Sequence, residues 1–180
     1  MKISMLDLIK KNIAGVVVNK ALKNKQTEGI SFKDVVRNSY KFLILMPENE
    51  SHFHHSFLVL NFFDSLKKDF SVFTHDFRVS LLPIKFRRFA INYGINDISR
   101  LNLPSHSLKQ KMNEMEFSIV LDLNKDENLF NSLIANIVKS EVRMGFKKND
   151  SDIYYNFQFE SAEDDPDIFY KNLLNCLQMF

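Results

Sequence analysis

The sequence predicts a three-layer, Rossmann-like α/β sandwich with a mainly parallel sheet of about five strands and an extra N-terminal amphipathic helix. Two observations lead to this fold class. Short apolar runs alternate with longer segments of helical periodicity, which is the pattern of strand, helix, strand units. The length of 180 residues is that of one ordinary domain. We therefore expect a single domain over residues 1–180 with right-handed crossovers.

The first predicted element is an amphipathic helix over residues 5–25. Its apolar side chains recur three and four residues apart, as in Ile9, Ile13 and Val17, while the lysines lie largely elsewhere on the helical wheel. We expect residues 1–30 to pack on the domain or to extend from it. The basic face could also contact a membrane surface. Charged residues interrupt the apolar stretch, so no export signal is expected.

A strand, helix, strand unit is predicted next. The run KFLILMP, residues 41–47, is apolar throughout and ends in proline, which is typical of a buried parallel strand. Helical spacing follows through Leu58, Phe62 and Leu66, and FSVFTH at 70–75 predicts a second strand. Within 76–112 we expect a turn at Tyr93-Gly94 and a third strand near Asp97 to Leu103.

The remainder of the chain continues the alternation. FSIVLDLN at 117–124 predicts a strand, and the next helix should hold Asp126 and Glu127 in its first turn. EVRMGF and DIYYNFQFE predict two further strands, and Asp164 or Asp165 should cap a last helix that begins at Pro166. The predicted core comprises Leu43, Ile44, Leu45, Val72, Ile119, Val120, Leu121, Leu133, Ile137, Leu173 and Leu177.

Composition narrows the classes of partner. The chain has 24 Lys plus Arg against 22 Asp plus Glu, and a net charge of +2 gives no strong field for nucleic acid or an anionic surface. We expect no nucleic acid partner and no membrane span, because every uncharged apolar run is too short to cross a bilayer. The single cysteine, Cys176, excludes an internal disulfide and suits the reducing cytoplasm.

The stretch MPENESHFHHSF at 46–57 gathers ionisable side chains in a loop behind the first predicted strand. In an open α/β sheet, ligands bind beyond the carboxyl ends of the strands. The candidate ligand-binding residues there are Glu48, Glu50, His52, His54 and His55. Imidazoles and carboxylates could also hold zinc or manganese, but this spacing fixes no geometry, and we predict neither a metal nor a cofactor. The stretch has no glycine, which argues against a phosphate cradle.

Two further patterns allow alternatives. Asp122 and Asn124 end a predicted strand, where they could accept a ligand hydroxyl or cap the next helix. KFRRFAINY at 85–93 interleaves basic and aromatic residues as single-strand binders do, although aromatic residues more often belong to the core. Arg143 and Gly145 are expected at a strand-end turn, with close packing at the glycine.

The order of these elements resembles a known family. A strand ending in Asp, a helix, and a strand with Arg-x-Gly-Phe, here Phe117 to Asn124 and then Arg143 to Phe146, is similar to the acceptor-binding N-terminal half of the lipopolysaccharide heptosyltransferases. That match covers roughly residues 40–146. Nearly the whole chain resembles a family of short bacterial proteins of unknown function, with a basic first helix, an LDLN-type strand and a closing helix of leucines.

The chain departs from the heptosyltransferases at the place of their catalytic base. Their first strand leads into a Gly-Asp loop, whereas the corresponding loop here reads Pro47-Glu48-Asn49-Glu50-Ser51-His52. The half that would hold the sugar nucleotide is also not in this sequence, and transfer requires both substrates to be held together. We expect a non-catalytic binding or interaction module for an unidentified protein or small ligand, with homodimerisation left open. The alternative is an enzyme, either completed by a partner chain or metal-dependent at residues 48–55.

Overall fold

The structure is a computed structural model that describes residues 15–16, 35–149 and 151–180. Its centre is one sheet of order β3-β2-β1-β4-β5-β6, in which all neighbouring strands are parallel. The strands are β1 (Lys41–Leu45), β2 (Asp69–His75), β3 (Ala90–Tyr93), β4 (Ile119–Asp122), β5 (Val142–Phe146) and β6 (Phe157–Phe159). The predicted α/β class is confirmed, with six strands rather than about five.

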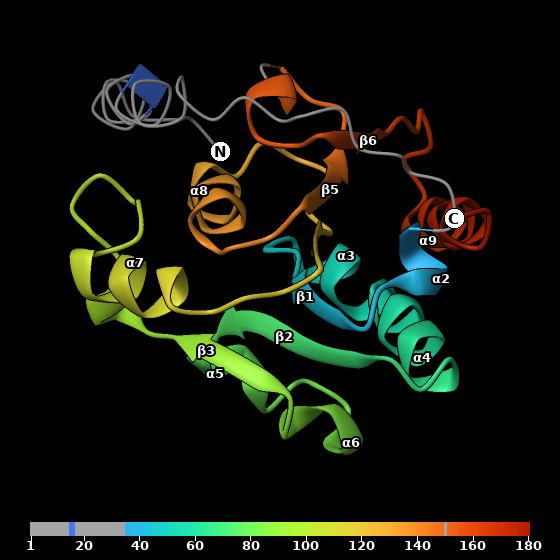
Figure 1. Ribbon diagram of the computed structural model, residues 1–180, viewed down its shortest axis with the longest axis horizontal. Coiled ribbons are helices and arrows are strands. Elements are labelled where there is room, and N and C mark those ends of the chain that lie inside the picture. Colours follow the sequence, from blue (N-terminus) through green and yellow to red (C-terminus); the bar gives the residue numbers. More distant parts are fainter. Residues whose placement is uncertain (1–14, 17–34, 150) are drawn as a thin grey trace.

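Helices cover both faces of the sheet, which makes the three predicted layers (Figure 1). The α-helices are α2 (Val35–Asn38), α3 (Glu50–His55), α4 (Phe57–Ser65), α5 (Asp76–Val79), α6 (Ile84–Arg87), α7 (His106–Asn113), α8 (Leu129–Ile137) and α9 (Pro166–Leu177). Short 3₁₀ helices lie at Ile95–Asp97 and Ser151–Ile153. Buried side chains of α2, α3, α4, α6 and α9 share one apolar cluster, and those of α7 and α8 share the other.

Strand β1 shows why the sheet is buried on both faces. Phe42 and Ile44 belong to the first apolar cluster, whereas Leu43 and Leu45 belong to the second. Successive side chains of a strand point to opposite faces, so a continuous apolar run fills both cores. Ten of the eleven predicted core residues are buried, and the remaining one, Ile137, is partly buried against the second cluster.

The register brings the carboxyl ends of the central strands to one edge. Leu45 pairs with Phe73 of β2 and with Asp122 of β4. On one side of β1 the sheet continues with β2 and then β3, and on the other side β1 pairs with β4. This order has its topological switch point between β1 and β4, and ligands of open α/β sheets bind at such a point.

The third strand lies earlier in the chain than predicted. Residues 90–93 form β3, while the predicted strand from Asp97 to Leu103 is wrong: the chain there leaves a 3₁₀ helix and makes only an isolated bridge between Ile98 and Pro104. The last strand is also shorter than predicted, because Tyr154 and Tyr155 turn into the second core before β6 begins. Both strands lie at the edges of the sheet, where only one side of the strand is paired. Their sequences therefore show a less regular apolar pattern.

The structure shows which residues cap the helices α8 and α9. Asp165 caps α9, and its side chain accepts hydrogen bonds from the backbone N–H groups of Asp167 at 2.8 Å and Ile168 at 3.3 Å. Asn128, not Asp122, caps α8, so Asp126 and Glu127 precede that helix rather than form its first turn. The helix predicted over residues 5–25 falls almost wholly outside the described residues. Within the described part of the chain, no helix is both long enough and apolar enough to cross a membrane.

Candidate functional site

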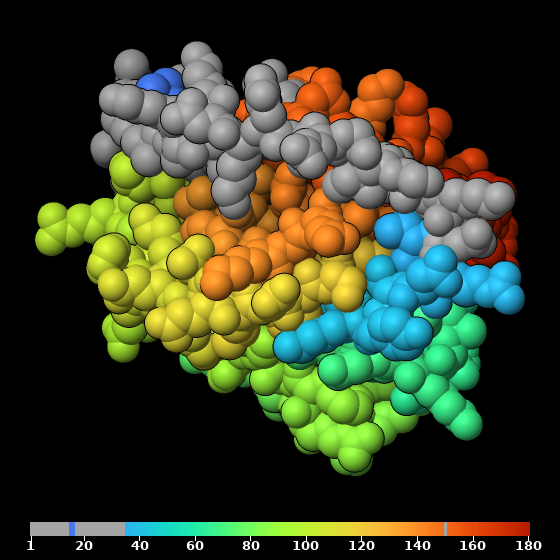
Figure 2. All heavy atoms as spheres, in the orientation of Figure 1, coloured from blue at the N-terminus to red at the C-terminus, as the bar shows by residue number. Residues whose placement is uncertain are grey.

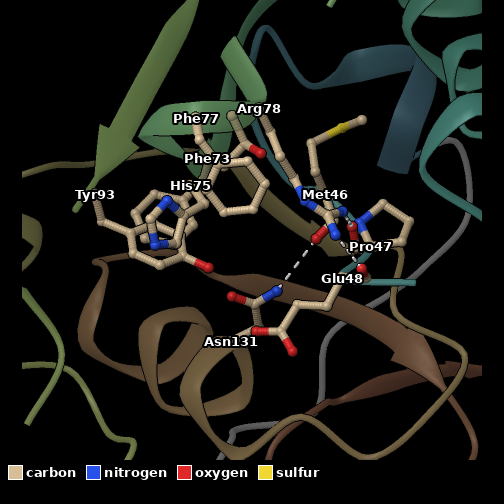
Figure 3. Close-up of a pocket in the computed structure, with 10 residues that line it drawn as sticks. Met46, Pro47, Glu48, Phe73, His75, Phe77, Arg78, Tyr93 and Asn131 are labelled. Carbon is tan, nitrogen blue, oxygen red and sulfur yellow. Dashed lines mark hydrogen bonds between the residues drawn. The ribbon is translucent and has the colours of Figure 1, made fainter. Parts of the chain in front are cut away.

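A hollow of about 270 Å³ lies over the carboxyl ends of β1, β2 and β3 (Figure 3). Three strand ends, helix α5 and the side of α8 contribute its walls. The lining residues are Met46, Pro47, Glu48, Phe73, Thr74, His75, Phe77, Arg78, Tyr93 and Asn131. This hollow is the larger of two at this edge of the sheet, which is the edge where ligands of α/β proteins bind.

The backbone of Pro47 and Glu48 forms the inner wall of the larger hollow and is held from two sides. On one side, Asn124 Oδ1 accepts a hydrogen bond from the Glu48 N–H at 3.0 Å, and its Nδ2 donates to Met46 O at 3.2 Å. On the other side, the Arg78 guanidinium donates to Pro47 O at 2.8 Å and also to Glu48 O. The carboxylate of Glu48 therefore projects from a fixed segment rather than from a free loop.

Asn131 presents a buried acceptor to the larger hollow. The residue is only 2 % exposed, and its Nδ2 donates to Met46 O at 3.4 Å. Its Oδ1 is buried and has no hydrogen-bond partner. Burying an amide oxygen without a donor costs free energy, so this atom is an open position for a ligand donor.

Tyr93 supplies a hydroxyl beside these groups. Burial, followed by the negative charge of Glu48, raises the pKa of Tyr93, so the phenol stays protonated and can donate. The hydroxyl points toward Asn131 and Glu48 (Figure 3). The Tyr93 ring stacks on Phe73 with a centroid distance of 4.9 Å, which gives the hollow one apolar wall.

His75 and Asp76 form a pair at the end of β2. Asp76 Oδ1 lies 2.6 Å from His75 Nδ1, and the His75 ring contacts Tyr93 with a centroid distance of 5.0 Å. Gly94 makes room for the carboxylate, because a Cβ at that position would lie 2.9 Å from Asp76 Oδ2. The contact is one of charge and proximity between chain neighbours, because His75 Nδ1 has no hydrogen-bond partner and Asp76 Oδ1 accepts from Phe77 N at 2.6 Å.

A smaller hollow of about 120 Å³ lies on the other side of the Pro47–Glu48 segment, between the ends of β1 and β4. His52 and Asn128 line it, and both His52 Nδ1 and Asn128 Nδ2 are buried without a hydrogen-bond partner. Burial, reinforced by the positive charge of Lys125, lowers the pKa of His52. Its ring makes edge contacts with Phe169 at 5.3 Å and Tyr170 at 5.7 Å.

The structure separates the candidates of the 46–57 stretch, because residues 50–55 form a helix, α3, and not a loop. Glu48 lines both hollows, and His52 and Asn124 line the smaller one. Glu50 and His54 are exposed, and His55 Nδ1 lies 2.8 Å from Ser51 O. Among the described residues, no group of three or more His, Cys, Asp or Glu side chains could hold a metal ion.

Asp122 is fully buried and faces neither hollow. Its carboxylate accepts hydrogen bonds from Asn124 N at 3.0 Å, from Asn124 Nδ2 at 2.7 Å and from the Tyr155 hydroxyl, and Lys148 Nζ lies 3.7 Å away. The predicted helix-cap role is wrong, because Asn128 caps α8, and the ligand contact stays a prediction. The carboxylate instead fixes Asn124, which in turn holds Glu48.

Of the residues that line the larger hollow, sequence reasoning named only Glu48 as a candidate, and His75, Arg78, Tyr93 and Asn131 are among those it missed. A signal existed for His75, since it ends a predicted strand and carboxyl ends of parallel strands gather at one edge. Asn131 lies within a helix and had no such signal. The rings of the 85–93 segment prove to belong to the interior, with Phe86 and Tyr93 buried and Phe89 partly buried.

The fold and the two hollows define an α/β protein with strand order 3-2-1-4-5-6 and a polar cavity beside its switch point. Comparison of the chain with protein-family models, with curated proteins and with solved structures finds no match. The arrangement of the residues is therefore the basis of the functional proposal.

Proposed function

We propose that this chain is a binding module whose larger hollow takes a small, neutral, polyhydroxylated molecule of monosaccharide size. The observation that carries this proposal is the buried, unpartnered Oδ1 of Asn131, which lines the hollow together with the Glu48 carboxylate and the Tyr93 hydroxyl. Two acceptors and one donor, all supplied by buried or fixed segments, suit a ligand that carries several hydroxyl groups.

The size and the walls of the larger hollow support the same class of ligand. A volume of about 270 Å³ lies just below the usual range of about 300–1,000 Å³ for small-molecule sites, which limits the ligand to a small one. Phe73 and Tyr93 are buried where they line the hollow, so they give it an apolar side. Hydroxyl groups on the ligand's edge would meet the polar side chains at the same time.

The larger hollow suits a phosphorylated ligand less well than a neutral one. The Arg78 guanidinium uses two of its five N–H donors on the Pro47 and Glu48 carbonyls, so its position is set by that backbone segment. The segment from Met46 to Phe57 contains no glycine to allow close backbone approach, and Glu48 adds a negative charge beside the hollow. These features favour a neutral ligand.

A non-catalytic role is supported by the place of Asp122, which is held in a buried network out of contact with both hollows. The proposed relation to a glycosyltransferase acceptor half agrees with a sugar-type ligand, and it remains a proposal. A cytoplasmic location belongs to the same proposal and rests on the single free cysteine, Cys176.

The His75–Asp76 pair favours a second candidate function, an enzyme that uses this hollow. His75 lines the hollow with its Nδ1 at 2.6 Å from Asp76 Oδ1, and an imidazole beside a carboxylate would accept a proton from a ligand hydroxyl. A partner chain would then supply the second substrate, as glycosyl transfer requires.

Saturation-transfer NMR on the full chain tests the binding proposal, with a panel of neutral monosaccharides, alditols and the corresponding sugar phosphates. We expect signals from neutral members that Asn131→Leu and Glu48→Gln weaken by about tenfold, the value of one hydrogen bond to a buried or charged group. Glu50→Gln, an exposed carboxylate outside both hollows, is the matched control and should bind as the wild type does. Preference for the phosphates, or binding unchanged by Asn131→Leu, would overturn the proposal.

A further inference from the structure

The segment of α5, α6 and the turn between them carries an exposed apolar row. The fully or largely exposed side chains Phe77, Leu81 and Ile84 have exposed fractions of 61 %, 47 % and 81 %. These are three of the ten large apolar side chains that are exposed within the described part of the chain, and they fall within eight residues of one another. Isolated exposed apolar residues are ordinary, but a concentrated group marks an interaction site.

The spacing of the segment explains why these side chains face outward. Leu82 and Phe86 are buried in the first apolar cluster and anchor the segment to the sheet. Leu81 lies in the turn after α5 and Ile84 is the first residue of α6, so these two exposed side chains flank the buried Leu82 and the extended Pro83. The row is therefore a consequence of anchoring and not of a loose loop.

Positive charge is concentrated beside this row. Residues 76–88 contain four Lys or Arg and one Asp, whereas the whole chain has a net charge of only +2. Lys85, Arg87 and Arg88 are exposed, and Arg88 lies over the Phe89 ring at 4.6 Å. Lys85 Nζ pairs with Asp64 Oδ2 at 2.8 Å, so Arg87 and Arg88 supply most of the local positive charge. A local cationic field around apolar side chains attracts an anionic, partly apolar surface.

We propose that this α5–α6 patch, made of Phe77, Leu81, Ile84, Lys85, Arg87 and Arg88, docks the protein on an anionic phospholipid bilayer. Leu81 and Ile84 would enter the acyl boundary while the cations contact lipid phosphates. Helix α6, which begins at Ile84, lies at the bottom end of the molecule in the view of Figure 1, and the same end is at the bottom of the space-filling view in Figure 2. An end of the molecule can enter a fluid surface without a matching shape.

Other partners fit the patch less well. A stable protein interface takes roughly 20–30 residues a side, far more than this row offers. Single-stranded nucleic acid needs aromatic faces for its bases, but two of the three exposed side chains are aliphatic and Phe86 is buried. The patch adjoins the larger hollow through Phe77 and Arg78, whereas Leu81 and Ile84 do not line it. Variants at the last two positions thus test the docking surface separately from the proposed ligand site.

Vesicle co-sedimentation of the full chain tests this proposal, using vesicles of phosphatidylcholine alone and vesicles of equal parts phosphatidylcholine and phosphatidylglycerol. We expect binding to the anionic vesicles only, weakened by added salt. The double variant Leu81→Ser, Ile84→Ser should bind at least about tenfold more weakly, because two apolar side chains lose their insertion. Lys85→Gln with Arg88→Gln should weaken binding by a similar factor, since each cation near an anionic surface contributes about fivefold.

The matched control is Ile153→Ser with Ile168→Ser, two side chains of comparable exposure, 43 % and 45 %, that lie outside the α5–α6 patch. This control should bind vesicles as the wild type does, and circular dichroism should show the same fold for all variants. Binding that survives both patch variants would lie elsewhere in the chain and would overturn the proposal. So would equal binding to neutral vesicles, stronger binding to single-stranded RNA than to vesicles, or a dimer that only the patch variants dissociate.

Discussion

The side-chain oxygen of Asn124 accepts a hydrogen bond from the backbone N–H of Glu48, 76 residues earlier in the chain, at a distance of 3.0 Å. This bond joins the end of β4 to the end of β1 across the switch point of the sheet. The amide group also donates to Met46 O and to the buried Asp122 carboxylate. One side chain therefore fixes the wall that separates the two hollows.

Substitution of Asn124 by alanine should destabilise the fold and loosen the ligand site together. The change leaves Glu48 N–H and the Asp122 carboxylate each short of a partner, and we expect a loss of about 2–3 kcal/mol in the free energy of unfolding. Urea unfolding measures this loss. Asn92→Ala, at an exposed asparagine of β3, is the control and should change stability by less than about 0.5 kcal/mol. Equal midpoints for the two variants would contradict the role of Asn124.

Gly145 is predicted to tolerate no side chain. The sequence predicted close packing at this glycine, and the structure confirms it, since an added Cβ would lie 2.9 Å from the Tyr155 ring. The residue lies within β5, so the predicted strand-end turn is wrong. Tyr155 cannot move freely, because its hydroxyl donates to Asp122 and lies 3.0 Å from Ser132 Oγ.

Gly145→Ala should therefore cost about 1–3 kcal/mol in thermal or urea unfolding, the usual cost of overpacking a core. Gly94→Ala is an informative comparison. Its Cβ would meet only the Asp76 carboxylate, at the end of an exposed side chain that can rotate away. We expect that variant to keep its stability, and a larger loss for Gly94→Ala than for Gly145→Ala would refute the packing argument.

The sequence predicted the central strands well, and its failures have physical reasons. Strands β1 and β4 are buried on both faces, so their apolar runs are unbroken. Strand β3 was missed because it is an edge strand whose Ala90, Ile91 and Asn92 are only partly buried or exposed. The sequence of such a strand has neither an unbroken apolar run nor a clear alternation of apolar and polar residues.

The candidate site was predicted in part for a similar reason. Glu48 followed from the rule that ligands bind beyond the carboxyl ends of strands, and it does line both hollows. Asn131 points inward because the packing of Phe130, Leu133 and Ile134 sets the rotation of α8 about its axis. This rotation cannot be predicted from the local sequence. The burial of Asp122 likewise depends on Tyr155, 33 residues later in the chain.

Stability should fall when the pH decreases below the ordinary pKa of histidine, and His52 should account for part of this fall. Burial lowers the pKa of His52 in the folded state. Between this lowered value and about 6.5, the unfolded chain binds a proton that the folded chain does not, so acid favours unfolding in that window. Urea midpoints measured from pH 7.5 to pH 5 should show the decline. His52→Gln should flatten it, and His106→Gln, at an exposed histidine of α7, is the matched substitution for comparison.

The chain alone is expected neither to hydrolyse sugar nucleotides nor to transfer from them, and to bind them weakly. The larger hollow is small for a nucleotide sugar, and its walls offer no glycine-rich turn for a diphosphate. Titration calorimetry with a panel of nucleotide sugars and a product assay test this expectation. Micromolar binding, or turnover abolished by Glu48→Gln or Glu50→Gln, would contradict it. Turnover that needs a fraction of the native lysate would favour the two-chain enzyme instead.

The chain is expected to bind no stoichiometric metal ion. Protein purified without an affinity tag and dialysed against a weak chelator should contain far less than one zinc or manganese ion per chain. The three histidines of α3 do not converge: His52 packs inward against Phe169, His54 is exposed, and His55 Nδ1 lies beside Ser51 O. A bound ion needs three or four ligands at one centre, so an isolated pair would hold it only weakly.

Elemental analysis decides the question when it is paired with His52→Ala, His54→Ala. Partial occupancy that persists in this double variant would mark adventitious binding at other exposed side chains, in agreement with the prediction. Close to one ion per chain, lost in the double variant, would show that these two histidines do meet at a common centre. Because His52 is held against aromatic rings of α9, that outcome would require α3 to move away from α9 on metal binding.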